Sequence, residues 1–342
     1  MNQHILTRRT DPALRAVRAG AGAISLPTLL VAMLSLPTAA TPQEVGCTAG
    51  ARLLRYACAA DLRDSFFTAR AQCIDTAFPN EACIEAAEEA FDEGAEECGE
   101  VFGARLQLCK AVDDAPYEPP FGVTFATNFV DPKLIGNGIA PNPYFPLVAG
   151  NRWVYENPDE TIVVEVLEET KLIDGISCVT VKDIVTEDGV PIEVTDDWYA
   201  QDVNGNVWYC GEISRSFEVF EGDDPEIAEL VELAGSWKHG RDAAKAGLLL
   251  PFAPEPGEVI RQEVKYTDAE DVIEILSITA TETAVGGSCT ETCLQTRDYT
   301  PLEPDPDSEE QKFYAPGIGL IVEVKPSTGE RLELIEFVGV GQ

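Results

Sequence analysis

The periodicity of hydrophobic and polar positions changes partway along the chain. Residues 46–112 are rich in strong helix formers, as in the run from Ile84 to Ala90. From Tyr144 onward, β-branched and aromatic residues alternate with charged ones in runs of six to ten residues separated by turn residues, a pattern typical of strands. We therefore expect a helical part and a β part. They are joined at 113–142 by a linker rich in proline and glycine, which is expected to wrap around the rest of the chain rather than to fold alone.

The alternating runs predict consecutive antiparallel strands. Strands are expected at Arg152–Glu156, Thr161–Glu169, Ser177–Thr186, Ile192–Asp202, Asn206–Ile213, Phe217–Phe220, Glu258–Tyr266, Asp271–Thr281, Cys293–Tyr299, Lys312–Tyr314, Leu320–Val324 and Arg331–Phe337. Asn204–Gly205 is a strong hairpin-turn signal, and Ile227–Leu233 is predicted as a short helix. The apolar run Leu248–Phe252 is expected in the core, with a cavity mouth as the alternative. The predicted fold class is α+β, with a helical hairpin before an antiparallel half-barrel or barrel over 143–342.

Six cysteines in the helical part form a palindrome. Their spacings are 11, 15, 10, 15 and 11 residues, so three pairs of residue numbers each add up to 156. Eleven or fifteen residues return a helix to within about 20° or about 60° of the same face. Two antiparallel helices turning near residue 78, at Phe78–Asn80, are therefore predicted to carry three nested disulfides: Cys47–Cys109, Cys58–Cys98 and Cys73–Cys83. A different pairing on the same helices is the alternative.

Four further cysteines lie in the β part. Cys178 and Cys293 both fall in strand-like runs, so we predict the bridges Cys178–Cys293 and Cys210–Cys289. A local Cys289–Cys293 loop is a close competitor. The irregular spacing does not favour a zinc site, and ten cysteines in total suggest five disulfides made in an oxidising compartment.

Residues 1–40 have the features of a signal peptide. Four arginines precede an apolar stretch, Ala21–Leu36, and a small-residue cleavage motif, Thr38–Ala40. The mature chain is predicted to begin near Thr41 and to be exported to the periplasm or the extracellular space. We find no other segment in the sequence that is long and apolar enough to span a membrane.

The net charge is strongly negative, at −36 for the whole chain, and the acids are spread along its length. Such a surface repels nucleic acid and anionic membranes. Solubility or a salty exterior explains this charge more simply than cation binding does. We therefore expect no nucleic-acid partner.

Several ordered motifs in the β part resemble a group of exported bacterial proteins without an assigned activity. They are Asn142–Leu147 followed by Gly150, Trp153 and Tyr155, then Asp197–Asp202, Gly205–Tyr209, Gly211–Glu212, Gly235–Trp237, Arg261–Glu263, Ala269–Asp271 and Tyr314–Gly319. The resemblance covers roughly residues 128–337 and implies one secreted β-rich domain. It leaves the cysteine-rich hairpin outside. Position 210 is more often aromatic in such sequences, which favours an added Cys210–Cys289 bridge.

The sequence contains few groups that could carry familiar chemistry. The only histidines are His4 and His239, so a multi-histidine metal centre in the mature chain is excluded. His239 is expected at the surface. The acidic run Asp305–Glu310 is expected to be a solvated loop, with calcium as a possible ligand and no other cofactor predicted.

The remaining candidates are acids near aromatic residues. Asp197, Asp202, Glu212, Glu263, Glu270 and Asp271 lie near Trp198, Tyr199, Trp208, Tyr209 and Trp237 in the sequence pattern. Paired carboxylates beside tryptophans can hydrolyse glycosides, or bind sugar or cations. Alternation along Asp197–Asp202 is interpreted as Trp198 pointing inward and Asp197 outward. Asp202 may instead cap the turn at Asn204–Gly205.

We expect a non-catalytic binding protein of the cell envelope. Its curved sheet would hold a small or apolar ligand through Trp198, Tyr199, Trp208 and Trp237, and its hairpin would cover the mouth or dock an envelope protein. One alternative is a carboxylate-dependent hydrolase acting on saccharide through Asp197, Glu212, Glu263 and Asp271. The other is a structural surface protein whose hairpin is an interaction module.

Overall fold

The computed structural model describes residues 45–75 and 80–340. Residues Gly46–Gln342 form one compact unit. The predicted signal peptide, and Phe78 and Pro79 of the predicted turn, lie outside the described residues.

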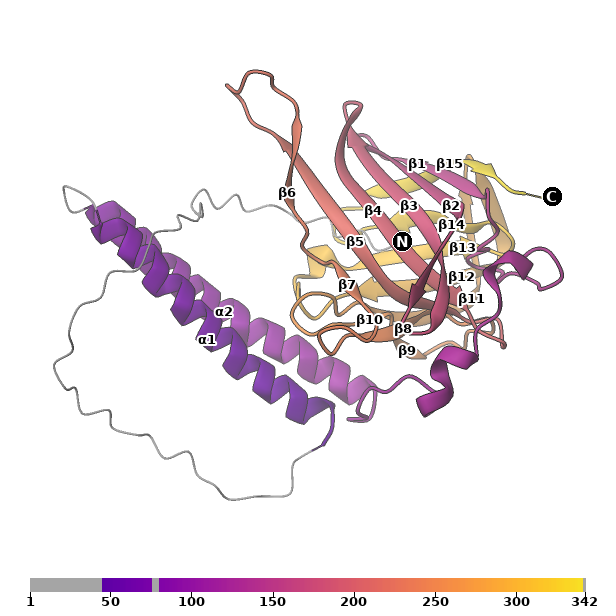
Figure 1. The fold of residues 1–342 in the computed structure, drawn as a ribbon, viewed down its shortest axis with the longest axis horizontal. Coiled ribbons are helices and arrows are strands. Elements are labelled where there is room, and N and C mark those ends of the chain that lie inside the picture. Colours follow the sequence, from indigo (N-terminus) through magenta and orange to yellow (C-terminus); the bar gives the residue numbers. More distant parts are fainter. Residues whose placement is uncertain (1–44, 76–79, 341–342) are drawn as a thin grey trace. The chain divides into compact units, whose positions relative to one another are not determined.

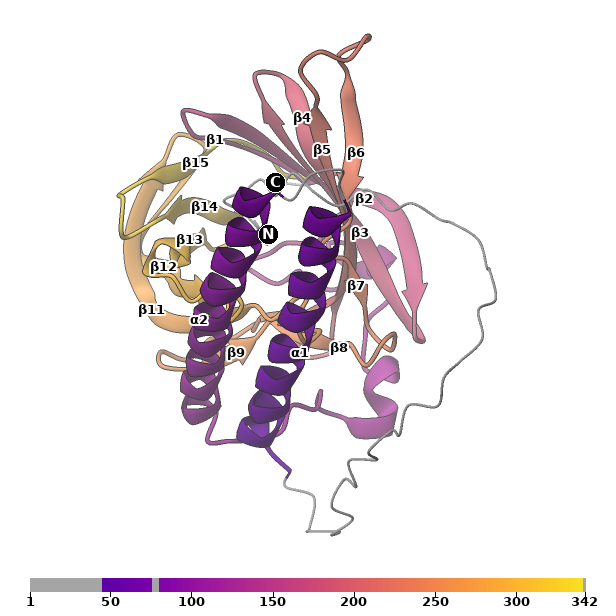
Figure 2. The ribbon, with the colours of Figure 1, turned by 90° about the vertical axis from the view of Figure 1, so that its left-hand side faces the viewer.

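Two long helices form the predicted hairpin. α1 covers Cys47–Ile74 and α2 covers Glu81–Ala111, and they lie side by side (Figures 1 and 2). Disulfides join Cys47 to Cys109, Cys58 to Cys98 and Cys73 to Cys83, so the nested pairing is confirmed. The side chain of Asn80 accepts a hydrogen bond from the backbone N–H of Cys83 at 3.2 Å, which makes it the N-cap of α2.

The proline-rich segment after α2 folds against the β part. It contains two short 3₁₀ helices, η1 (Gly122–Thr127) and η2 (Pro132–Leu134). Phe125 on η1 is buried in a cluster on the outer face of the sheet. The segment therefore wraps over part of the β domain, as expected for this linker.

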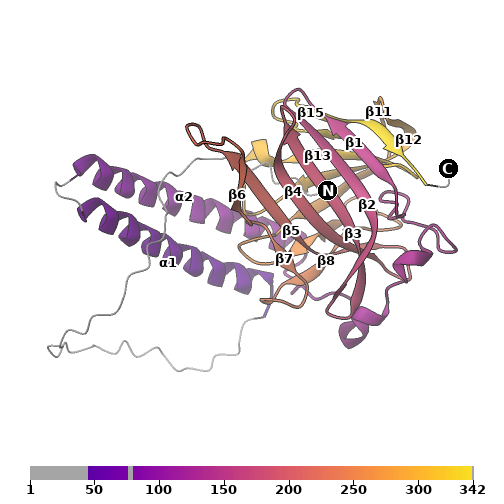
Figure 3. The same cartoon turned by 45° about the horizontal axis from the view of Figure 1, so that its top comes forward.

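The rest of the chain forms a single antiparallel sheet of fifteen strands that curves into a nearly closed barrel (Figures 1 and 3). The strands are β1 (Arg152–Glu156), β2 (Glu160–Ile173), β3 (Ile176–Glu187), β4 (Val190–Gln201), β5 (Val207–Val219), β6 (Ala228–Glu232), β7 (Trp237–Lys238), β8 (Lys245–Leu250), β9 (Val259–Arg261), β10 (Glu263–Val264), β11 (Val272–Ala284), β12 (Gly287–Tyr299), β13 (Glu310–Ala315), β14 (Gly319–Val324) and β15 (Arg331–Val338). A third 3₁₀ helix, η3 (Pro306–Ser308), precedes β13. The predicted α+β class is confirmed.

The barrel closes where β9 and β10 follow each other in the chain. β10 is at one end of the sheet, beside β8, and β9 is at the other end, beside β11. Gln262 lies between them, and its side chain donates to the carbonyl of Leu249 at 2.8 Å. Gly247 permits this closure, because a Cβ there would lie 2.1 Å from the carbonyl oxygen of Gln262.

The prediction of a short helix at Ile227–Leu233 is wrong. Residues Ala228–Glu232 form β6, which pairs with the end of β5. Seven residues are too few for a stable isolated helix, whereas the end of β5 offers unpaired backbone groups to a strand. The predicted strand Phe217–Phe220 is the continuation of β5 to Val219.

The two predicted disulfides of the β domain are also wrong. The structure has Cys178–Cys210 and Cys289–Cys293, so the local loop that competed in the sequence is the observed bridge. Cys178 and Cys210 lie in one cluster with Ala200 of the intervening strand β4. The small side chain of Ala200 leaves room for a bridge across that strand.

The Cys289–Cys293 bridge depends on an irregularity in β12. In a regular strand, residues four apart are about 13 Å apart, but these two Cα atoms are 5.3 Å apart. The register of β11 with β12 shifts in this region, and Glu291 has a positive φ of 53°. The bulge shortens the strand and brings the two sulfurs together.

Candidate functional site

A row of side chains crosses the interior of the barrel at one level. The register places Val181 of β3 opposite Asp197 of β4, Asp197 opposite Glu212 of β5, and Glu212 opposite Trp237 of β7. Side chains opposite each other on neighbouring strands point to the same face. Two carboxyl groups therefore lie side by side inside the protein.

Tyr209 contacts Asp197, and two further aromatic rings pack on Tyr209. The hydroxyl of Tyr209 donates a hydrogen bond to Asp197. The ring of Tyr199 stacks on that of Tyr209 at 4.5 Å between centroids, and the ring of Trp237 meets Tyr209 edge-on at 5.4 Å. Burial raises the pKa of Asp197 to about 6, although the hydrogen bond from Tyr209 lowers it.

Glu212 is a second buried acid of this group with a raised pKa. Burial raises its pKa well above the usual range, and the charges of Glu263, Asp197 and Asp271 raise it further. Among the described residues, its Oε1 atom has no hydrogen-bond partner. A buried carboxyl in these surroundings binds a proton readily and attracts a cation or a hydrogen-bond donor.

Glu263 connects the acidic interior with a pocket. Its Oε1 atom accepts a hydrogen bond from the indole N–H of Trp237 at 3.3 Å. The same residue lines a pocket at the junction of the hairpin and the barrel. One wall of this pocket consists of Cys47, Ala51 and Leu108 from the two helices, and the opposite wall includes Val264 and Tyr266.

Two arginines also line the pocket, and each already has contacts. Arg105 of α2 forms a buried ion pair with Glu270. Arg261 donates to the Sγ atom of Cys47 at 2.8 Å, and its guanidinium lies over the ring of Tyr117 at 5.8 Å. The pocket therefore combines apolar walls with these charged side chains, and further buried carboxyls lie behind Glu263.

The structure divides the predicted ligand-binding aromatics between two faces of the sheet. Tyr199 and Trp237 belong to the interior group. Trp198 and Trp208 instead lie in the outer cluster with Phe125 of η1, and Lys171 and Lys238 lie over the ring of Trp198 at 4.1 and 4.9 Å.

The predicted orientation of Asp197 is therefore wrong. It faces the barrel interior, and Trp198 faces the outer cluster. Both faces of β4 are buried because the segment carrying η1 covers the outer one. Alternation predicts only that the two side chains point in opposite directions.

Asp202 has the structural role that was considered for it. Its Oδ1 atom accepts from the backbone N–H of Asn204 at 2.8 Å and of Asn206 at 2.9 Å. Its Oδ2 atom accepts from the indole N–H of Trp208 at 3.0 Å. Asp202 thus holds the β4–β5 turn and takes no part in the interior group.

The prediction that His239 lies at the surface is wrong. Its Nδ1 atom accepts a hydrogen bond from the backbone N–H of Ala246 at 2.9 Å, and its ring meets Phe125 edge-on. Burial lowers its pKa, although the charge of Asp174 opposes this. The neutral ring fills the outer cluster.

Sequence analysis missed a second buried charge cluster on the other side of the barrel. The ammonium of Lys312 lies 3.3 Å from Asp298, 3.1 Å from Glu310 and 3.5 Å from Glu323. Burial raises the pKa of Glu323 to about 8, with Glu310 adding to the effect and Lys312 opposing it. The only sequence signal for this cluster is that Glu310, Lys312 and Tyr314 are alternate residues of one strand. Alternation does not show which face of that strand is buried.

A metal site is not found in the part of the chain that the structure describes. No group of three or more His, Cys, Asp or Glu there has a geometry that could hold a metal ion. In the acidic run, Asp305 caps η3 by accepting from the backbone N–H of Asp307 at 2.9 Å. Calcium at this run stays a hypothesis.

The interior acids are poorly placed for attack on a polymer. Asp197, Glu212 and Glu263 are 5, 3 and 1 % exposed, whereas glycoside hydrolysis needs two carboxyls on either side of an accessible bond. Their arrangement with tyrosine and tryptophan rings suits the binding of a small cationic group.

Among the described helices, none is both long enough and apolar enough to cross a membrane. No protein-family model, no curated protein and no solved structure matches this chain.

Proposed function

We propose that this chain is an exported binding protein of the cell envelope, and that its ligand is a small organic cation with an apolar portion. The observation that carries the proposal is the position of Glu263, which lines the junction pocket and also belongs to the buried acidic group of Asp197 and Glu212. The apolar portion would contact the pocket walls, and the cationic group would face the acids.

The charge balance favours a cation over an anion. Around Glu212, the nearby groups that raise its pKa are all carboxyls: Glu263, Asp197, Asp271 and Glu193. An ammonium group there would allow these acids to ionise and would gain from the faces of Tyr199, Tyr209 and Trp237. An anion would be repelled.

Export is the other part of the proposal. Five disulfides stabilise the described chain, which is consistent with a non-cytoplasmic protein. A periplasmic or extracellular site and the signal peptide at 1–40 rest on the sequence.

The test is calorimetric titration of the mature protein with hexylammonium, and in parallel with hexanol and hexanoate. We expect heat of binding with the amine only. Glu212→Gln should weaken amine binding at least about tenfold, and Glu165→Gln, an exposed acid on β2, should leave it unchanged. Equal binding of the three probes, or none of the amine, would overturn the proposal.

The saccharide hydrolase and the purely structural protein are the alternatives. The hydrolase uses the same acids, Asp197, Glu212, Glu263 and Asp271, and predicts sugar cleavage that Glu212→Gln abolishes. The structural protein predicts that no small molecule binds and that removal of 46–112 abolishes assembly while 144–342 still folds. The burial of the acids and the pocket beside Glu263 favour binding over both.

A further inference from the structure

The outward side of α1 carries large apolar side chains in contact with solvent. Leu53, Tyr56, Phe67 and Ile74 are exposed by 70, 75, 67 and 66 %. At 100° per residue they fall within about 60° of one another around the helix. We call these four residues, with Ala60 between them, the outer stripe.

The outer stripe lies on the side of α1 away from α2. Cys47, Cys58 and Cys73, which bridge to α2, lie about half a turn around the helix from it. The exposed residues therefore do not serve the packing of the hairpin itself. Their successive spacings are three, four, seven and seven residues, which keeps all of them on one face of the helix.

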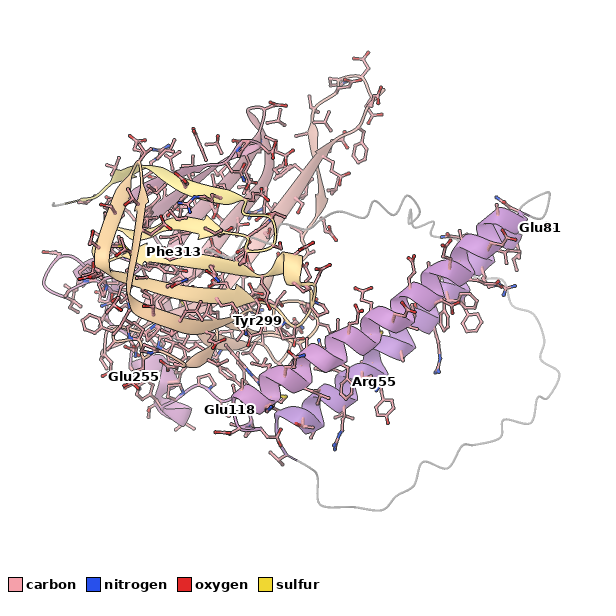
Figure 4. The ribbon with its side chains drawn as sticks, turned by 180° about the vertical axis from the view of Figure 1, so that it is seen from behind. Arg55, Glu81, Glu118, Glu255, Tyr299 and Phe313 are labelled. Atoms are coloured by element: carbon pink, nitrogen blue, oxygen red, sulfur yellow. A yellow bond between two sulfur atoms is a disulfide. The ribbon has the colours of Figure 1, made fainter. Side chains whose placement is uncertain are left out.

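We propose that the outer stripe is the interface at which two copies of this chain pair through their α1 helices. The supporting observation is charge complementarity at its borders. Arg63 and Asp64 are consecutive and so lie about 100° apart, one on each border of the stripe. Among the described residues, neither has a recorded ion pair. Figure 4 shows α1 from behind, with Arg55 labelled on the helix.

The borders also set the relative direction of the two helices. In a parallel pair the twofold axis runs along the helices, so one border of the stripe meets the other border of the partner. Arg63 then lies beside the partner's Asp64, and the contact occurs twice by symmetry. In an antiparallel pair each border meets itself and Arg63 faces the partner's Arg63, which is unfavourable. The parallel arrangement is therefore the one proposed.

A membrane surface fits this face less well. α2 carries nine acidic residues against two basic ones, so the hairpin as a whole is repelled by anionic lipid. A second copy of α1 presents both signs of charge beside its apolar stripe, so it can pair with an acidic as well as a basic border, which a uniformly anionic surface cannot do.

The test is sedimentation velocity of the mature protein at micromolar concentrations. We expect a dimer. Phe67→Glu should raise its dissociation constant at least about tenfold, because it places a charge in the stripe. Leu172→Glu, at a residue of β2 that is 74 % exposed, is the matched control and should leave the dimer intact.

The charged borders test the parallel direction. Arg63→Asp and Asp64→Arg should each weaken the dimer, and the double variant should restore it. A dimer that neither single variant weakens would contradict the parallel arrangement. A monomer at every concentration, or a dimer that Phe67→Glu leaves intact, would overturn the proposal. So would a monomer that binds vesicles of anionic phospholipid through this stripe. None of these outcomes bears on amine binding, which concerns the interior of the barrel.

Discussion

Arg105 and Glu270 form an ion pair across 165 residues of sequence, with N–O distances of 2.9 and 2.5 Å and both side chains 6 % exposed. The pair joins the last turns of α2 to the start of β11. Glu270 also accepts a hydrogen bond from the backbone N–H of Thr267 at 2.8 Å. The attachment of the hairpin to the barrel therefore includes a fully paired buried charge.

Breaking this pair should destabilise the protein strongly. Glu270→Ala leaves the guanidinium of Arg105 buried without its partner, and we expect a loss of about 3–5 kcal/mol in the free energy of unfolding. Urea denaturation measures it. The matched control is Arg152→Ala, which breaks an exposed pair with Glu336 and should cost less than about 1 kcal/mol. Similar losses in the two variants would show that the buried pair is not as described.

Stability should fall as the pH rises from acidic to neutral. Burial raises the folded-state pKa of Asp197 to about 6, against an ordinary value of 3.8, and raises that of Glu212 well above its ordinary value of 4.5. The folded protein holds these protons more tightly, so their contribution is complete below pH 4 and is lost as the pH passes the folded pKa values. Each group contributes a slope of up to about 1.4 kcal/mol per pH unit.

Glu212→Gln should remove part of this dependence. The variant should be more stable than the wild type at pH 8, with a smaller difference at pH 5, when both are unfolded by urea. Glu165→Gln should follow the wild type at each pH. A wild-type stability that rises from pH 5 to pH 8 would contradict the burial of these acids.

The two disulfides of the β domain should differ in their effect on stability. Cys178–Cys210 closes a separation of 32 residues and Cys289–Cys293 one of 4. In the chain-entropy model, their loss costs about 4 and about 2 kcal/mol. We expect this order for the double alanine variants in urea. Peptide mapping under non-reducing conditions checks the pairing itself, and recovery of Cys178 with Cys293 would contradict it.

Asp202 should be important for the β4–β5 turn. Asp202→Ala removes the acceptor for two backbone N–H groups and leaves the indole N–H of Trp208 buried without a partner. We expect a loss of about 2–4 kcal/mol in urea, with altered tryptophan fluorescence. Asp159→Ala, at an exposed turn residue, should stay within about 0.5 kcal/mol of the wild type.

The hairpin was predictable because its disulfides constrain the spacing of the cysteines along the sequence. Nested disulfides in an antiparallel helix pair require cysteine positions that are symmetric about the turn, and the pair Cys58 and Cys98 follows that rule. Strand β1 was predicted to the residue, because Arg152–Glu156 places three strand-forming residues between two charged ones. Spacing left Cys289–Cys293 as one candidate but could not decide the remaining bridges, because they depend on a bulge near Glu291 and on the small side chain of Ala200.

The candidate site was predictable in its membership but not in its arrangement. Alternation along β4 separates Asp197 from Trp198, yet it cannot say that η1 covers the outer face and leaves both sides buried. Opposition of Asp197 and Glu212 follows from strand register, which includes an irregularity between Trp198 and Tyr199. A bulge of one residue changes every pairing beyond it.

Gln262 gives the barrel an unusual topology. The two margins of the sheet, β10 and β9, are consecutive pieces of one chain, so the ring is completed by a covalent link one residue long. Its circumference cannot increase by peeling the margins apart, because the main chain ties them. A single cut of the backbone at this residue would leave the two margins joined by non-covalent contacts alone, among them the hydrogen bond from Gln262 to Leu249, whereas a cut in a hairpin loop would leave the covalent link in place.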